Sequence, residues 1–144
     1  MKDCIFCQIV KCGSKSYKIY EDEYILSILD KSPSSKGHCL LIPKKHYKDI
    51  YDINEKTLKR IAAALKKVSF LLKKKLNCTG INILHASGND AQQSIFHFHF
   101  HLLPRYKGDG INAWVESPRK GTTFDDEIKS LYRKFIGKRQ TSKK

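Results

Sequence analysis

The chain has 144 residues, of which 28 are Lys or Arg and 14 are Asp or Glu, and its formal net charge is +14. This length suits one domain that buries a core of its own. The early apolar stretches are too short for a signal peptide or a membrane span, so we expect a cytoplasmic protein without membrane association. The charge admits an anionic partner, but basic and aromatic residues do not interleave as in a base-stacking platform, so nucleic acid is not expected.

The first predicted element is a helix of one or two turns in DCIFCQIVKCG, capped by Asp3 and ending near Gly13. It places Cys4 and Cys7 on one face. Two thiolates at this spacing can share a tetrahedral zinc ion, for which His46 and His97 are candidate further ligands. The alternative is two small buried thiols. The odd total of five cysteines argues against a disulfide framework, and Cys12, Cys39 and Cys78 are interpreted as packing residues.

The next segments predict the beginning of a sheet and one long helix. KSYKIYED and EYILSILD are typical of two strands separated by an acidic turn, and HCLLIP predicts a third strand that Pro43 closes. From Asn54 to Leu76 apolar residues recur at spacings of three and four, with lysines elsewhere, which predicts an amphipathic helix.

The remainder predicts two more strands and a short helix. GINILHAS is a fourth strand, GNDAQQ a polar loop, and SIFHFHFHLLP a fifth strand beside the fourth. FDDEIKSLYRKFI predicts a closing helix, followed by a basic tail. Because this order holds too few helices for a parallel sheet, we expect an antiparallel α+β fold.

Three histidines occupy alternate positions in FHFHFHLLPR, residues 96–105. In a strand, His97, His99 and His101 would share one face, the apolar residues between them would face the core, and Pro104 would end the ladder. The polar face of a strand usually carries Thr, Lys or Glu, so three imidazoles indicate a functional site instead of a face that is only solvated. A metal site and an acid-base or nucleophilic site both remain open.

If His97 binds a metal, His99 and His101 stay free on the same face, ~6.6 Å apart along the strand. This pair suits a phosphorus centre, because a neutral imidazole is a competent nucleophile and a neighbouring imidazole can carry a proton at a similar pH. Ser94 and the backbone amides around Gly88 could bind phosphate oxygens. Activity is then expected to peak near neutrality.

QSIFHFHFHLLP resembles the signature of the histidine triad (HIT) family, and CIFCQIV, YEDE, ILDKSP and KGHCLLIPKKH resemble the segments that precede it in bacterial members. The resemblance runs from about Asp3 to Trp114. It implies a five-stranded antiparallel sheet with one long helix and short flanking helices, usually paired as a homodimer. We therefore expect a HIT domain over residues 1–115 and a C-terminal extension over residues 116–144 with a short helix and the basic tail.

The resemblance also implies an activity, the hydrolysis or transfer of nucleoside monophosphates bound to amines, phosphates or sugars. It makes His99 the nucleophile that forms a nucleotidyl-histidine, His101 the group that assists at the phosphate and leaving group, and His38 a third member of the catalytic cluster. The implied substrate is a purine nucleotide, such as an AMP derivative. Its base would be bound by Phe6, Ile9 and Ile28, its ribose by Asp30, and its phosphate by Gln93 and Ser94.

A structural zinc ion is a further implication. The related galactose-1-phosphate uridylyltransferases bind zinc through a Cys-x2-Cys pair and two histidines, and some bacterial HIT proteins look the same, which implies a site at Cys4, Cys7, His46 and His97. Two positions depart from the family pattern. Ala86 stands where Asn or Gln commonly contacts phosphate, and Gln92 replaces a usual Gly. The phosphate contact of the missing amide is therefore either absent or made instead by Asn89 or Gln92.

Three functions compete on these observations. The first is a nucleotidyl hydrolase acting on nucleoside 5′-phosphoramidates or dinucleoside polyphosphates, and the second is a noncatalytic nucleotide-binding or scaffold protein. The third is an enzyme that removes AMP from DNA ends, which the net charge motivates. Retention of all three triad histidines favours the first function over the second, and the third lacks a C-x2-C…H-x3-H extension after the domain to hold DNA.

Overall fold

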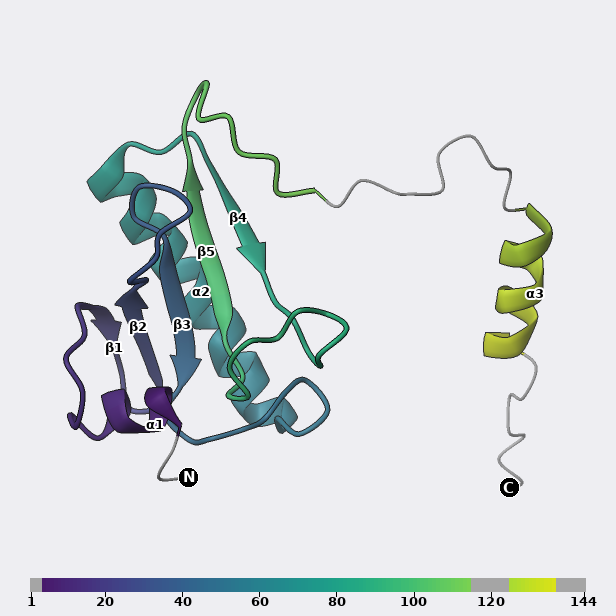
Figure 1. Ribbon diagram of the computed structural model, residues 1–144, viewed down its shortest axis with the longest axis horizontal. Helices are drawn as coiled ribbons and strands as arrows, with labels where there is room; N and C mark the ends of the chain where they lie inside the picture. Colours follow the sequence, from purple (N-terminus) through teal and green to yellow (C-terminus); the bar gives the residue numbers. More distant parts are fainter. Residues whose placement is uncertain (1–3, 115–124, 137–144) are drawn as a thin grey trace. The chain divides into compact units, whose positions relative to one another are not determined.

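The computed structural model describes residues 4–114 and 125–136 (Figure 1). The chain divides into two compact units, residues 1–112 and 113–144, and the second unit contains helix α3 (Asp125–Ile136). The elements of the first unit are, in order, α1 (Ile5–Val10), β1 (Lys18–Glu21), β2 (Ile25–Leu29), β3 (Cys39–Pro43), α2 (Glu55–Leu76), β4 (Gly80–Leu84) and β5 (Phe100–Arg105).

The strands form one five-stranded sheet in the order β1-β2-β3-β5-β4, and every neighbouring pair is antiparallel. The predicted α+β class, the antiparallel sheet and the single long helix are therefore confirmed. No described helix has the length and apolarity needed to cross a membrane.

Each face of the sheet buries its own hydrophobic cluster. Helix α2 covers one face (Figure 1), where Ile61, Val68 and Leu72 pack with strand residues such as Leu41 and Leu102. On the other face, Phe6 and Ile9 of α1 pack with apolar side chains of β2 and β3, namely Leu26, Ile28, Leu40 and Ile42. Because β2 and β3 are covered on both faces, they consist almost entirely of apolar residues.

The bounds of α2 follow the predicted ones closely. The Asn54 side chain accepts a hydrogen bond from the Thr57 N–H at 2.8 Å and caps the first turn. At the other end Asn77 adopts the left-handed conformation, with φ of 53°, that ends many helices.

Two predicted details at the ends of elements were wrong. The N-cap of α1 is Cys4, without a side-chain hydrogen bond, whereas the predicted cap, Asp3, lies outside the described residues. The fifth strand begins at Phe100 instead of Ser94, because the chain before it bonds elsewhere: the Phe98 N–H donates to the Tyr47 carbonyl at 2.6 Å.

Pro104 also does not end the ladder, since β5 continues to Arg105. The pairing of β3 with β5 stops at Cys39 and Leu102, so β4 is the only strand paired with β5 at Pro104. A residue without an N–H is tolerated where one side of the strand has no partner.

Candidate functional site

A cavity of about 590 Å³ opens on the α1 face of the sheet. Its apolar part is lined by Phe6 and Ile9 of α1 and by Ile28 of β2. Its polar part is lined by four of the predicted site residues, Asp30, Ser94, His99 and His101. The fold thus brings together residues from separate segments of the chain in one pocket that has both apolar and polar lining residues.

His99 is held in one neutral tautomer. Its Nδ1 lies 2.6 Å from the backbone carbonyl of His97, and because a carbonyl can only accept, Nδ1 carries the proton. The other ring nitrogen, Nε2, is therefore left with a free lone pair. Burial lowers the pKa of His99, which keeps the ring neutral, and the edge of the Phe6 ring packs against it at 5.2 Å between centroids. A neutral imidazole with a free nitrogen is a nucleophile.

His38 and His101 form a short proton relay behind His99. The Ser34 N–H donates to Nδ1 of His38 at 3.1 Å, so neutral His38 carries its proton on Nε2. That Nε2–H donates to Nδ1 of His101 at 2.9 Å, which places the proton of neutral His101 on its own Nε2. Burial lowers the pKa of both rings. His101 lines the pocket, so it can offer this N–H to a bound group.

Asp30 lies beside the relay, with its Oδ2 3.6 Å from Nε2 of His38 and 4.0 Å from Nδ1 of His101. These three side chains could in principle hold a metal ion. A metal on Nε2 of neutral His38 would, however, move the proton to Nδ1, against the N–H of Ser34. The arrangement therefore fits a proton relay better than a metal site.

His85 is a site-forming residue that the sequence interpretation missed. Its Nδ1–H donates to the backbone carbonyl of His99 at 2.8 Å, and its Nε2 accepts from the Ser87 hydroxyl at 2.7 Å. The ring also packs against Phe98 and Phe100. His85 thereby holds the backbone of the triad in place. The available signal was its position at the end of the predicted fourth strand, next to the triad strand.

Gln93 is not brought to the pocket, although it was predicted to contact phosphate. It is buried, its Oε1 accepts from the Gly88 N–H at 2.8 Å, and its Nε2 donates to the carbonyls of Lys48 and Ile95. All three bonds are to backbone, so Gln93 shapes the loop that precedes the triad.

The two departures from the family pattern lie in the same loop. None of Ala86, Asn89 and Gln92 is among the residues that line the pocket. Gln92 adopts a φ of 65°, in the left-handed region that glycine occupies at little cost. The side chain that replaces the usual Gly therefore strains this turn.

The four predicted metal ligands meet at one end of the sheet, and their ligand atoms lie within 4.8 Å of one another. Nδ1 of His97 is 3.4 Å from Sγ of Cys4, 3.6 Å from Sγ of Cys7 and 3.2 Å from Nδ1 of His46. Sγ of Cys7 is 3.3 Å from Nδ1 of His46. Ligands of a tetrahedral zinc ion lie roughly 3.3 to 3.8 Å apart when the bonds to sulfur and nitrogen have their usual lengths.

The tautomer of His97 fits this use. Its Nε2–H donates to the Pro43 carbonyl at 2.9 Å, which leaves the lone pair of Nδ1 facing the two thiols and His46. Burial lowers the pKa of His97 to about 4, so the ring is neutral at physiological pH, as a ligand must be. The cluster can therefore hold a metal ion with four protein ligands.

The family model for the HIT domain matches residues 13–108. Among curated relatives, the protein named hit of Bacillus subtilis is 41% identical over 113 residues, which cover 78% of each chain. An adenosine 5′-monophosphoramidase of Candida albicans is 36% identical over 85% of this chain and 82% of its own length. A Zn-bound histidine triad family protein from Mycobacterium smegmatis has a similar structure, with a TM-score of 0.74, 32% identity and coverage of 95% and 99% of the two chains.

Proposed function

The chain belongs to the HIT domain family, and from this membership and the geometry of its histidines we propose that it is a nucleotidyl hydrolase. It acts on nucleoside 5′-phosphoramidates or dinucleoside polyphosphates and releases AMP or a related nucleotide through a nucleotidyl-histidine. The observation that carries this proposal is the hydrogen bond from His99 to the His97 carbonyl, which leaves the nucleophilic nitrogen free in a nucleotide-sized pocket. The similarity to a monophosphoramidase supports the class of substrate.

The pocket suggests how the substrate lies. The purine fits among Phe6, Ile9 and Ile28, which gives affinity and weak discrimination between bases because these side chains are apolar. The ribose hydroxyls meet the carboxylate of Asp30, and Ser94 borders the phosphate position near His99. This orientation places the α-phosphorus within reach of the nucleophile.

In the first step Nε2 of His99 forms a bond to the α-phosphorus while the bond from phosphorus to the leaving group breaks. The leaving group takes the proton from Nε2 of His101. Nδ1 of His101 then accepts the Nε2 proton of His38, so the ring next to the phosphate is neutral again. In the second step Nε2 of His101 takes a proton from water as the water oxygen bonds to phosphorus, and the bond from phosphorus to Nε2 of His99 breaks. Nδ1 of His101 then returns its proton to Nε2 of His38, so all three rings regain their starting neutral tautomers.

We further propose that the metal at Cys4, Cys7, His46 and His97 is zinc and that its role is structural. The ligand types and spacing suit zinc, and the similar protein from Mycobacterium smegmatis is described as Zn-bound. Four protein ligands leave no open position for water, so the ion would tie α1 to the sheet instead of acting at the phosphate.

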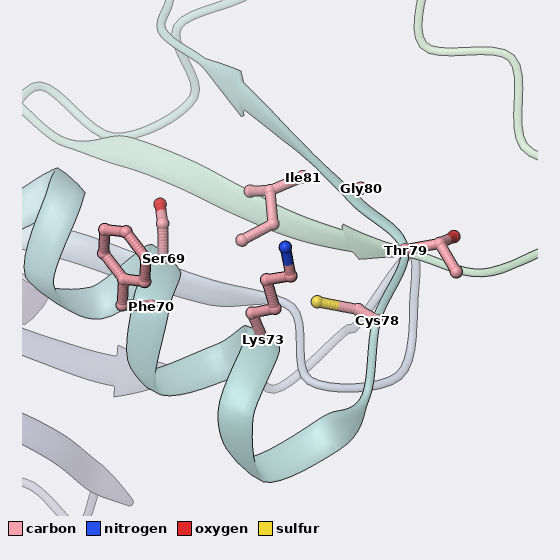
Figure 2. A pocket seen from close by; sticks show the side chains of 7 residues that line it. All are labelled: Ser69, Phe70, Lys73, Cys78, Thr79, Gly80 and Ile81. Carbon is pink, nitrogen blue, oxygen red and sulfur yellow. The ribbon is translucent and has the colours of Figure 1, made fainter.

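A homodimer is part of the same proposal. Strand β4 forms an edge of the sheet, and Ile83 and Leu84 on it are 44% and 38% exposed. Figure 2 shows the adjoining hollow, a cavity of about 270 Å³ between α2 and β4, where Phe70 of α2 is 63% exposed. A second copy related by a two-fold axis would cover both the strand edge and these side chains. Light scattering at micromolar concentration should give twice the chain mass, and a monomer mass would contradict the dimer.

A turnover panel tests the activity. Adenosine phosphoramidate, diadenosine polyphosphates and adenylated DNA should be offered to the zinc-loaded protein, with the His99→Asn variant as the inactive control. We expect release of AMP from at least one of the first two substrates. Tight AMP binding without turnover of any substrate would instead identify a noncatalytic nucleotide-binding protein, and turnover of adenylated DNA alone would support removal of AMP from DNA ends.

A further inference from the structure

A second charged cavity, of about 430 Å³, lies where the start of α2 meets the ends of β2 and β3. Four cationic side chains, Lys44, Lys45, Lys56 and Arg60, line it, with Glu23 as the one carboxylate in the lining. The catalytic pocket is lined from the α1 face of the sheet, whereas this cavity adjoins α2, which covers the opposite face (Figure 1). The proposed hydrolysis uses none of these residues.

Most of this positive charge is not neutralised within the protein. Lys44 pairs with Glu21 at 2.9 Å. Among the residues that the structure describes, no ion pair within 4.0 Å involves Lys45, Lys56 or Arg60. Two of these cations lie over aromatic rings instead: Lys45 over Tyr47, and Arg60 over Tyr24 at 3.3 Å from the ring centroid. A ring orients a cation without cancelling its charge.

The charges on α2 are also placed where they do not help the helix. Lys56 lies in the first turn, at the positive end of the helix dipole, and Arg60 is four residues further, so the two like charges are neighbours on the surface. The whole helix has one acidic residue, Glu55, against eight basic ones. A face that is only solvated usually mixes both signs. Cations in the last turn favour the helix dipole, but Lys56 in the first turn and its neighbour Arg60 do not, and an anionic ligand would offset their repulsion.

We propose that this cavity and the adjoining face of α2 bind the phosphates of a nucleic-acid strand, independently of its sequence. Lys56 and Lys67 are eleven residues apart in the helix, or about 16 Å, enough to follow several phosphates. No aliphatic side chain lines the cavity, so nothing there would insert into a lipid bilayer. The sequence did not suggest this site because Tyr24 and Arg60, which stack in the fold, are distant in the chain.

The proposal goes beyond the proposed hydrolase function and does not depend on it. Because the two sites lie on opposite faces of the sheet, nucleic acid and AMP should bind without competing. This independence separates the cavity from any nucleic-acid binding that occurs through the catalytic pocket.

The test uses the full zinc-loaded chain and a fluorescent single-stranded 20-nucleotide DNA of mixed sequence. Anisotropy titrations at several salt concentrations give the affinity and its salt dependence. The variant Lys45→Gln/Lys56→Gln removes two exposed cations of the cavity. The matched control Lys74→Gln/Lys75→Gln removes two exposed cations from the other end of α2 and changes the net charge equally. Circular dichroism and zinc content confirm that each variant is folded.

We expect the cavity variant to bind at least about tenfold more weakly at ~50 mM salt and its salt slope to fall by about 1.4, the share of two phosphate contacts. The control variant should change both quantities much less, and saturating AMP should not displace the DNA from the native protein. Equal losses in the two variants would show a net-charge effect and overturn the proposal. So would displacement by AMP, or binding to vesicles containing phosphatidylserine without binding to DNA.

Discussion

Removal of the metal should undock α1 from the sheet. The helix has only six residues, too few to be stable alone in water. Phe6 and Ile9 are each 3% exposed, and their burial contributes ~2 to 3 kcal/mol apiece, or about 5 kcal/mol together. Ordering six residues costs at least about 1 kcal/mol each, or about 6 kcal/mol. The packing and the ordering nearly cancel, so bonds from the proposed metal to Cys4 and Cys7 would decide whether α1 stays in place.

The consequence reaches the substrate, because Phe6 and Ile9 also line the nucleotide pocket. We expect the Cys4→Ala/Cys7→Ala variant, and the native protein stripped by a chelator, to bind AMP at least about tenfold more weakly, a loss of ~1.4 kcal/mol. Hydrogen exchange measured by mass spectrometry should show loss of amide protection in residues 5–10, while α2 stays protected. Titration calorimetry gives the AMP affinity, and elemental analysis gives the zinc content.

Cys12→Ala is the matched control, since Cys12 is an exposed thiol just after the same helix and lies outside the ligand cluster. It should keep zinc, amide protection and AMP affinity. If the amides of α1 remained protected without metal, the reasoning that zinc docks this helix would be refuted. A metal-free protein that is fully active and stable would refute the zinc site itself.

Three further predictions concern the histidines. His99→Asn should keep the fold and AMP binding but lower turnover by several orders of magnitude, while His101→Asn should lower turnover on the order of 10²-fold. Mass spectrometry of quenched native enzyme should find AMP on the His99 peptide. Near-normal turnover of His99→Asn would disprove its role as the nucleophile. His38→Ala should lower kcat by up to ~10²-fold with little change in KM, because His38 acts through His101 and does not line the pocket; an equal rise in KM would indicate a structural role instead. Because burial lowers the pKa of His99 and His101 from the ordinary value of 6.5, both rings are neutral at neutral pH, and on acidification kcat should begin to fall only below pH 6.5. A fall in kcat on acidification that is already complete above pH 6.5 would contradict the neutral relay.

The sequence by itself determined the period of each element and the chemistry of the triad. Alternation in HFHFHLLP was enough to place the histidines on one face and Phe98 and Phe100 towards the core, although Phe96 before them is exposed. The spacing of three and four predicted α2 to within a residue, because both patterns depend only on local backbone geometry. The Cys-x2-Cys spacing likewise predicted that both thiols share one face, because that placement depends on only one turn of helix. The resemblance to the HIT family supplied residue roles that the periodicities alone left open.

Only the tertiary structure decided which groups meet and which tautomers they adopt. The tautomer of His99 is determined by the carbonyl of His97, and that of His101 by an N–H in the loop before β3. His85, the residue after β4, supports the backbone of the triad. Gln93 faces backbone instead of phosphate for the same reason: its partners come from loops whose path local patterns do not determine. Hydrogen-bond partners depend on long-range packing, so a local pattern can predict a side chain's face but not the atoms it contacts.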